Sequence, residues 1–176
     1  MFMLTSFNPG SGKSFLAMNI AMSFAIKKKR ILVIDGDLRH GSTSSYVDSP
    51  KTGLSDYLGN RVSDWKEIIV KDEKYDNLHI IPIGTVPPNP TELLEDGKLA
   101  TLIEVLRSEY DYIFIDCPPI DIVADAQIIE KLADRTVFVV RSGLLDRSML
   151  PELENIYQEK RFKNLSVILN GTGSAG

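Results

Sequence analysis

The sequence has one cysteine, no long apolar run and no excess of positive charge. The single Cys117 excludes an internal disulfide and argues against a cysteine-based metal site. No apolar stretch approaches the roughly 20 residues of a membrane-spanning helix, and the N-terminus lacks the charged and then apolar pattern of a secretory signal. The net charge is −4, whereas a nucleic-acid-binding domain usually carries a basic surface. We therefore expect a cytoplasmic domain that does not bind nucleic acid.

Apolar runs alternate with helical patterns along the 176 residues, and the composition fits one globular domain. The run Ile31–Ile34 is wholly apolar, as buried parallel strands tend to be. Other strands are predicted at 1–5, 78–81, 112–115, 136–140 and 165–169, and helices at 14–28, 99–110 and 150–157. This alternation predicts an α/β fold: a mostly parallel, doubly wound sheet with helices on both faces, in a single domain over residues 1–176.

The strongest functional signal is a Walker A-like loop between the first predicted strand and helix, although Phe7 replaces its usual first glycine. Gly10 and Gly12 allow backbone N–H groups to approach a polyphosphate at a helix N-terminus. Lys13 can reach the β- and γ-phosphates, and the Ser14 hydroxyl can bind Mg²⁺. The fold is therefore predicted to be that of a P-loop NTPase that binds ATP or ADP. The residues expected to contact the nucleotide are Asn8, Pro9, Gly10, Ser11, Gly12, Lys13, Ser14 and Phe15.

Aspartates stand where two later strands end. Asp35 and Asp37 follow the strand at 31–34, and Asp116 ends an apolar strand in the form of a Walker B motif. Each could be a turn or cap former in isolation. Doubly wound sheets, however, bind ligands at the carboxyl ends of their strands, so beside a phosphate loop these carboxylates indicate a metal and catalytic site. Spacing alone leaves open whether Asp35 or Asp37 serves the metal.

Taken together, the three motifs resemble those of the cytoplasmic domain of bacterial tyrosine kinases (BY-kinases) of capsular and exopolysaccharide biosynthesis. The run Asp35-Gly36-Asp37-Leu38-Arg39 is similar to the family's second, Walker A′ motif, and residues 84–94 are similar to another family segment. The resemblance extends from about Leu4 to Gly171. Related partition ATPases carry a signature lysine where this chain has Asn8, which favours the kinase over a partition-type ATPase switch. A nucleotide-binding interaction module is the other alternative.

The resemblance implies an ATP-dependent protein-tyrosine kinase that autophosphorylates and regulates polysaccharide synthesis or export. It places Asp35 toward the acceptor hydroxyl and Asn170 near the adenine; an Asn-Gly turn is the plainer interpretation of Asn170. The catalytic residues it implies are Lys13, Asp35, Asp37 and Asp116. The magnesium ligands it implies are Ser14, Asp37 and Asp116.

The family phosphorylates a tyrosine cluster on its own C-terminal tail, in trans within a ring. The six tyrosines of this chain form no cluster. The implied partners are therefore the tyrosine-rich tail of a parent chain or neighbouring subunit and a membrane activator segment or protein. The abrupt start and end of the sequence lead us to expect a domain excised from a larger chain anchored at the inner membrane.

Five other polar positions have plainer expectations. Asn89 and Glu92, three residues apart, predict the reciprocally capped start of a helix. Asp125 is expected to cap the following helix. His40 and His79 have no metal partners at credible spacing, so we expect them to be solvated or packed.

Overall fold

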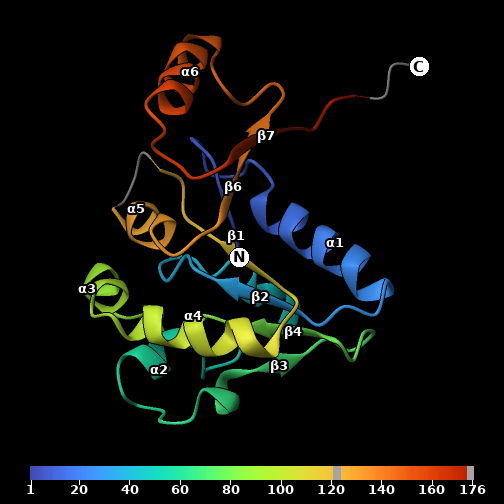
Figure 1. The fold of residues 1–176 in the computed structure, drawn as a ribbon, viewed down its shortest axis with the longest axis vertical. Coiled ribbons are helices and arrows are strands. Elements are labelled where there is room, and N and C mark those ends of the chain that lie inside the picture. The colour runs from blue at the N-terminus through green and yellow to red at the C-terminus, as the bar shows by residue number, and fades with distance from the viewer. Residues whose placement is uncertain (121–123, 174–176) are drawn as a thin grey trace.

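The computed structural model describes residues 1–120 and 124–173 as a seven-stranded sheet flanked by helices (Figure 1). The strands are β1 (Phe2–Thr5), β2 (Ile31–Asp35), β3 (Val70–Lys71), β4 (Leu78–Ile81), β5 (Tyr112–Asp116), β6 (Arg135–Arg141) and β7 (Leu165–Asn170). The helices are α1 (Lys13–Ile26), α2 (Leu54–Leu58), α3 (Pro90–Glu95), α4 (Lys98–Glu109), α5 (Asp125–Glu130) and α6 (Leu150–Gln158). Three short 3₁₀ helices are η1 (Ser44–Val47), η2 (Trp65–Ile68) and η3 (Arg147–Met149).

The strand order is β3-β4-β2-β5-β1-β6-β7, and every neighbouring pair except β3 with β4 is parallel. The first strand therefore lies inside the sheet, between β5 and β6, and the chain winds outward from it in both directions. This arrangement confirms the predicted α/β fold. It also brings the carboxyl ends of β1, β2 and β5 to one edge, where the predicted site residues follow them.

Alternate residues of each central strand enter two separate cores. In β2, Ile31 and Val33 pack on the face covered by α1, while Leu32 and Ile34 pack on the face covered by α4. Figure 1 shows α1 on one side of the sheet and α3, α4 and α5 on the other. Because both faces are covered, a central strand must be apolar throughout, which is why its sequence shows no alternation.

Two features of the fold escaped the sequence analysis. Strand β3 has only two residues and runs antiparallel to β4 at the edge of the sheet. Helix α2 has five residues, too few to display a helical period. No helix within the described residues is both long and apolar enough to cross a membrane.

Two predicted caps were wrong in detail. Helix α3 does begin after Asn89, but the Asn89 side chain makes no capping hydrogen bond; its Nδ2 donates to Glu92 Oε2 (3.0 Å). The amide thus pairs with a carboxylate, and reciprocal capping is lost. Asp125 is the first helical residue of α5 and does not cap it. Its side chain turns inward to Thr91 and Arg39.

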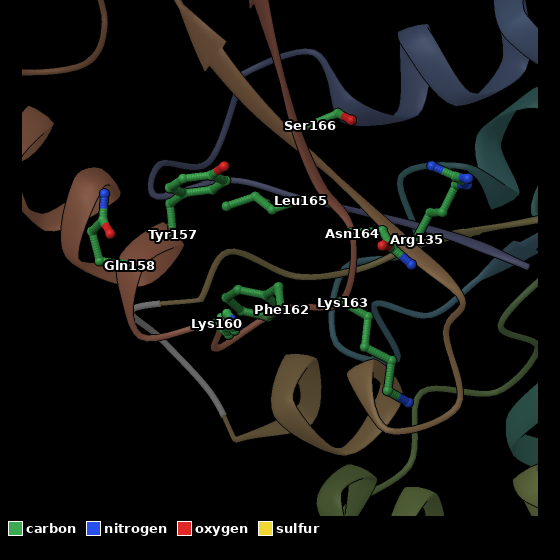
Figure 2. A pocket seen from close by; sticks show the side chains of 9 residues that line it. All are labelled: Arg135, Tyr157, Gln158, Lys160, Phe162, Lys163, Asn164, Leu165 and Ser166. Carbon is green, nitrogen blue, oxygen red and sulfur yellow. The ribbon is translucent and has the colours of Figure 1, made fainter.

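A cavity of about 820 Å³ lies beside β6 and β7, and Figure 2 shows its aromatic wall of Tyr157 and Phe162. Arg135 and Leu165, which also line it, are the first residues of these two strands. The cavity is therefore at the amino ends of the strands. The predicted site lies at the opposite, carboxyl edge of the sheet.

Candidate active site at the carboxyl edge of the sheet

The phosphate loop joins β1 to α1 and depends on two glycines in the left-handed region, Gly10 (φ 73°) and Gly12 (φ 91°). The left-handed angle favours glycine at position 12, and a Cβ there would stand 2.3 Å from Asn170 Nδ2 and displace that amide. Asn170 Nδ2 donates to the carbonyl of Ser11 (3.0 Å), and Arg141 Nη1 donates to that of Gly10 (2.7 Å). The loop is thus held from the ends of β6 and β7.

Inside the loop, two hydroxyls converge on one carbonyl. Ser6 Oγ and Ser11 Oγ each donate to the carbonyl of Asn8 at 2.7 Å. Phe7, in place of the motif's first glycine, is buried and meets Phe138 edge to face, with ring centroids 4.8 Å apart. The departure from the usual motif therefore extends the core beneath the loop. Of the other predicted contact residues, Pro9 is exposed and Phe15 is 57% exposed.

Lys13, the first residue of α1, is almost wholly buried. Its Nζ donates to Ser6 Oγ (3.1 Å), so the ammonium group lies under the loop. Burial lowers the pKa of Lys13, while the negative charges of Asp116 and Asp37 raise it. This cation therefore lies between the phosphate loop and the carboxylates, as its predicted role requires.

Asp116 is buried at the end of β5 and meets the second residue of α1. Its Oδ2 accepts hydrogen bonds from Ser14 Oγ and from Thr43 Oγ1, the latter at 2.7 Å. Burial raises the pKa of Asp116, and these two hydrogen bonds oppose the rise. Within the described residues its Oδ1 is buried without any hydrogen-bond partner. A buried carboxylate oxygen with no donor is a ready ligand for a hard cation.

The donor set at this position fits Mg²⁺. Magnesium prefers oxygen ligands and is commonly held by one or two carboxylates together with substrate phosphates and waters. The orphaned Oδ1 of Asp116, the adjacent Ser14 hydroxyl and the carboxylate of Asp37 supply oxygen donors of this kind.

Asp35 is fully buried at the end of β2. Its Oδ2 accepts from the backbone N–H and from the hydroxyl of Ser44, both at 2.7 Å, and its Oδ1 accepts from the N–H of Asp37 (3.3 Å). Burial raises the pKa of Asp35 to about 7; the charge of Asp116 adds to the rise and the hydrogen bonds from Ser44 oppose it. A carboxyl group in this range can exchange a proton near neutral pH.

Asp37 is slightly more accessible, at 8% exposed. Its Oδ1 accepts from the backbone N–H groups of Arg39 and His40, both at 3.2 Å, and His40 Nδ1 lies 3.1 Å from its Oδ2. His40 is thus in contact with a predicted site residue, which the sequence analysis did not anticipate. His79 is packed as expected, with Nδ1 2.6 Å from the Tyr110 hydroxyl.

The structure therefore brings Lys13, Ser14, Asp35, Asp37 and Asp116 to one edge of the sheet. Asn170 contacts the phosphate loop, while its adenine contact remains a prediction. Other site neighbours were missed: Ser6, Arg39, His40, Thr43, Ser44 and Arg141. A run of serine and threonine at 42–45, two residues beyond the Walker A′-like motif, was the one available signal for two of them.

Comparisons with known proteins agree with this geometry. The family model of the AAA domain matches residues 3–143. The putative tyrosine-protein kinase CapB of Staphylococcus aureus is 34% identical over 169 residues, which are 96% of this chain and 73% of that protein. The tyrosine-protein kinase YwqD of Bacillus subtilis is 35% identical over 171 residues, 96% of this chain and 71% of that protein.

Solved structures agree as well. The kinase domain of the Escherichia coli tyrosine kinase ETK superposes with a TM-score of 0.90 at 31% identity, covering 99% of this chain and 68% of that one. The septum site-determining protein MinD of Pyrococcus horikoshii, complexed with Mg-ADP, has a TM-score of 0.77 at 22% identity, covering 96% and 68%; this likeness shows the fold alone. With the phosphate loop, the paired aspartates and the strand-end Asp116 assembled as the motifs require, this chain belongs to the family of bacterial tyrosine-protein kinases.

Proposed function

We propose that this kinase domain binds ATP with Mg²⁺ at the phosphate loop and transfers the γ-phosphoryl group to a tyrosine hydroxyl. The observation that carries the proposal is the contact of Ser14 with Asp116 beside the buried cation of Lys13; among the residues that the structure describes, none donates to the second, buried oxygen of Asp116. Phosphoryl transfer needs little covalent help from a protein. It depends mainly on holding the nucleotide in place and on neutralising charge around the transferred group.

The nucleotide-binding role falls to the loop and the start of α1. Backbone N–H groups around Gly10 and Gly12 offer donors to the phosphates, and the α1 N-terminus adds its positive dipole end. We assign Lys13 to the β- and γ-phosphates, a role in which a phosphate oxygen replaces Ser6 Oγ as its acceptor. Asn170, at the end of β7, is assigned to the adenine side.

Ser14, Asp37 and Asp116 would hold the magnesium ion. When bound, Mg²⁺ offsets the negative charge of the phosphates. The Asp116 carboxylate is kept in place by the hydroxyls of Ser14 and Thr43. Asp37 is kept in place by the backbone N–H groups of the residues that follow it. These hydrogen bonds orient the proposed metal ligands.

We assign Asp35 to the acceptor side of the site. A tyrosine hydroxyl has a pKa near about 10 and must lose its proton as it is phosphorylated. A general base works best when its pKa lies near the working pH, and that of Asp35 is about 7. Because Asp35 is fully covered, this role requires the Ser44 segment to shift when the acceptor enters.

We further propose that the acceptor is the tyrosine-rich tail of a parent chain or neighbouring subunit. A membrane segment or membrane protein would activate the domain, which would act at the cytoplasmic face of the inner membrane in capsule or exopolysaccharide synthesis. Support for this comes from membership of the kinase family and from the resemblance of its motifs.

The proposal is tested by incubating the domain with Mg·ATP and a peptide that carries several tyrosines, with products identified by mass spectrometry. Phosphotyrosine on the peptide, absent for Lys13→Met, is the expected result. Release of free phosphate without phosphotyrosine would instead identify an ATPase switch. Absence of both products, with nucleotide still bound, would identify a binding module.

A further inference from the structure

Three polar side chains from separate elements meet beside the loop that holds Asp37. Arg39 follows β2, Thr91 lies in the first turn of α3, and Asp125 begins α5. Arg39 Nη2 donates to Thr91 Oγ1 (3.1 Å), and Thr91 Oγ1 donates to Asp125 Oδ1 (2.7 Å). Arg39 Nε lies 3.4 Å from Asp125 Oδ2. We call this group the Arg39–Thr91–Asp125 triad.

The triad has a buried anionic end and a partly exposed cationic end. Asp125 is fully buried, and within the described residues its Oδ2 accepts no hydrogen bond. A buried carboxylate is tolerated when a cation and hydrogen bonds compensate for its lost water. Here the Arg39 guanidinium is the paired cation and the Thr91 hydroxyl is the donor. Unlike an exposed ion pair, which holds its partners weakly, this group restrains the Arg39 side chain.

The same residue restrains the Asp37 carboxylate through its backbone. The N–H of Arg39 donates to Asp37 Oδ1 (3.2 Å), and the N–H of His40 donates to the same oxygen (3.2 Å). Arg39 thus contacts Asp37 through its backbone and the buried carboxylate of Asp125 through its side chain. Because the Arg39 side chain is restrained, the backbone N–H of Arg39 is restrained as well, and this N–H orients the Asp37 carboxylate.

We propose that the Arg39–Thr91–Asp125 triad positions the Asp37 carboxylate for Mg²⁺, with its members acting as positioning residues and not as metal ligands. The inference rests on the proposed function, because it takes Asp37 as a magnesium ligand. Substituting groups that orient a metal ligand from behind typically weakens metal affinity about 10–100-fold. Thr91 and Asp125 belong to helices that follow β4 and β5. Through the triad, these two helices support the proposed metal ligand Asp37, which follows β2.

The test measures ADP binding by calorimetry, first in EDTA and then across a Mg²⁺ titration. Asp125→Asn keeps the shape of the buried group and removes its charge, while Thr91→Val removes only the bridging hydroxyl. The matched control is Asp56→Asn. Asp56 is also a buried carboxylate paired with an arginine, Arg61 at 2.8 Å, but it lies outside the loop at 37–40.

For Asp125→Asn, the Mg²⁺ concentration that gives half of the magnesium effect on ADP affinity is expected to rise about tenfold, which corresponds to about 1.4 kcal/mol. Thr91→Val is expected to raise it about threefold. Affinity for ADP in EDTA should stay within about twofold of wild type, because the phosphate loop is unaltered. Turnover of Asp125→Asn should recover at saturating Mg²⁺. The control should melt at a lower temperature with an unchanged magnesium midpoint.

Unchanged magnesium midpoints in both triad variants would overturn the inference. An equal rise of the magnesium midpoint in Asp56→Asn would overturn it too, since the rise would then be a general effect of lost stability. If Asp125→Asn does not fold, Thr91→Val decides alone, because it retains both charges. A wild-type domain whose ADP binding ignores Mg²⁺ would contradict the proposed function itself, and this inference with it.

Discussion

Replacing Asp35 by asparagine should stabilise the folded domain while impairing phosphoryl transfer. The carboxyl group is fully buried, and its pKa rises from 3.8 in a free side chain to about 7. A carboxyl group whose folded pKa is raised binds its proton more tightly in the native state. The stability that this proton contributes is fully present below about pH 4, the unfolded pKa, and is lost as the pH rises through the folded pKa of about 7. Above pH 7 the wild-type fold therefore carries a buried charge that the variant lacks.

The size of the effect follows from the same values. The difference between 3.8 and about 7 corresponds to about 4 kcal/mol, at 1.36 kcal/mol per pKa unit. An amide that keeps its oxygen toward Ser44 forfeits the hydrogen bond from the N–H of Asp37, at a cost of about 1 kcal/mol. Local relaxation around the buried charge reduces the remaining difference further, so we expect the free energy of unfolding of Asp35→Asn to exceed that of wild type by about 2 kcal/mol at pH 8. For a domain of this size that is an increase in Tm of roughly 4–8 °C.

The assay is thermal unfolding followed by circular dichroism at several pH values from 4 to 8, in EDTA. Wild-type stability should decline between pH 4 and 7 relative to that of Asp35→Asn, and the two curves should converge at low pH. Asp111→Asn is the control of opposite sign: this exposed carboxylate accepts hydrogen bonds from Arg30, which lower its pKa. A variant less stable than wild type at pH 8 would refute the reasoning.

Three further predictions concern the site and its accidental acceptors. Lys13→Met should reduce ADP affinity at least tenfold in calorimetry, because it removes the cation beneath the phosphate loop; unchanged affinity would contradict the loop assignment. Asp37→Asn should weaken the magnesium dependence of ADP binding, whereas Asp35→Asn should leave it intact and lower transfer to tyrosine; equal loss in both would contradict that division of roles. Incidental self-phosphorylation, mapped by mass spectrometry, should occur at Tyr46, which is 47% exposed, and not at Tyr110. The Tyr110 hydroxyl contacts His79, and burial raises the pKa of Tyr110 to about 12. Modification mainly at Tyr110 would show that the domain opens far more than its packing indicates.

The sequence predicted the sheet and the main site because both rest on local signals. Continuous apolar strands, glycines before a lysine and aspartates at strand ends each occupy a few adjacent residues, and parallel winding then brings them to one edge. Thus β4 was predicted with its observed bounds at Leu78 and Ile81. In contrast, the two residues of β3 hold their place only by pairing with β4, and no local pattern marks them.

Contacts between distant segments account for what was missed. Asp125 was expected to cap its own helix because aspartate near a helix start usually does so. Its partners Arg39 and Thr91 are 86 and 34 positions away, and only the folded chain brings them within reach. Arg141 likewise meets Gly10 across 131 positions. Sequence motifs identify the residues that face a ligand. The residues that support those motif residues come together only in the tertiary fold.

The attachment of the phosphate loop to β6 and β7 has a consequence for how the domain acquires its site during synthesis. The loop precedes β6 and β7 in the chain, but the side chains that hold its carbonyls belong to Arg141 and Asn170, 131 and 159 positions beyond their partners. On a ribosome, a nascent chain ending before β7 would carry the entire Walker A-like segment without the amide that closes it. The capacity to retain nucleotide should therefore appear only when β7 docks, after the loop that defines it has long been synthesised.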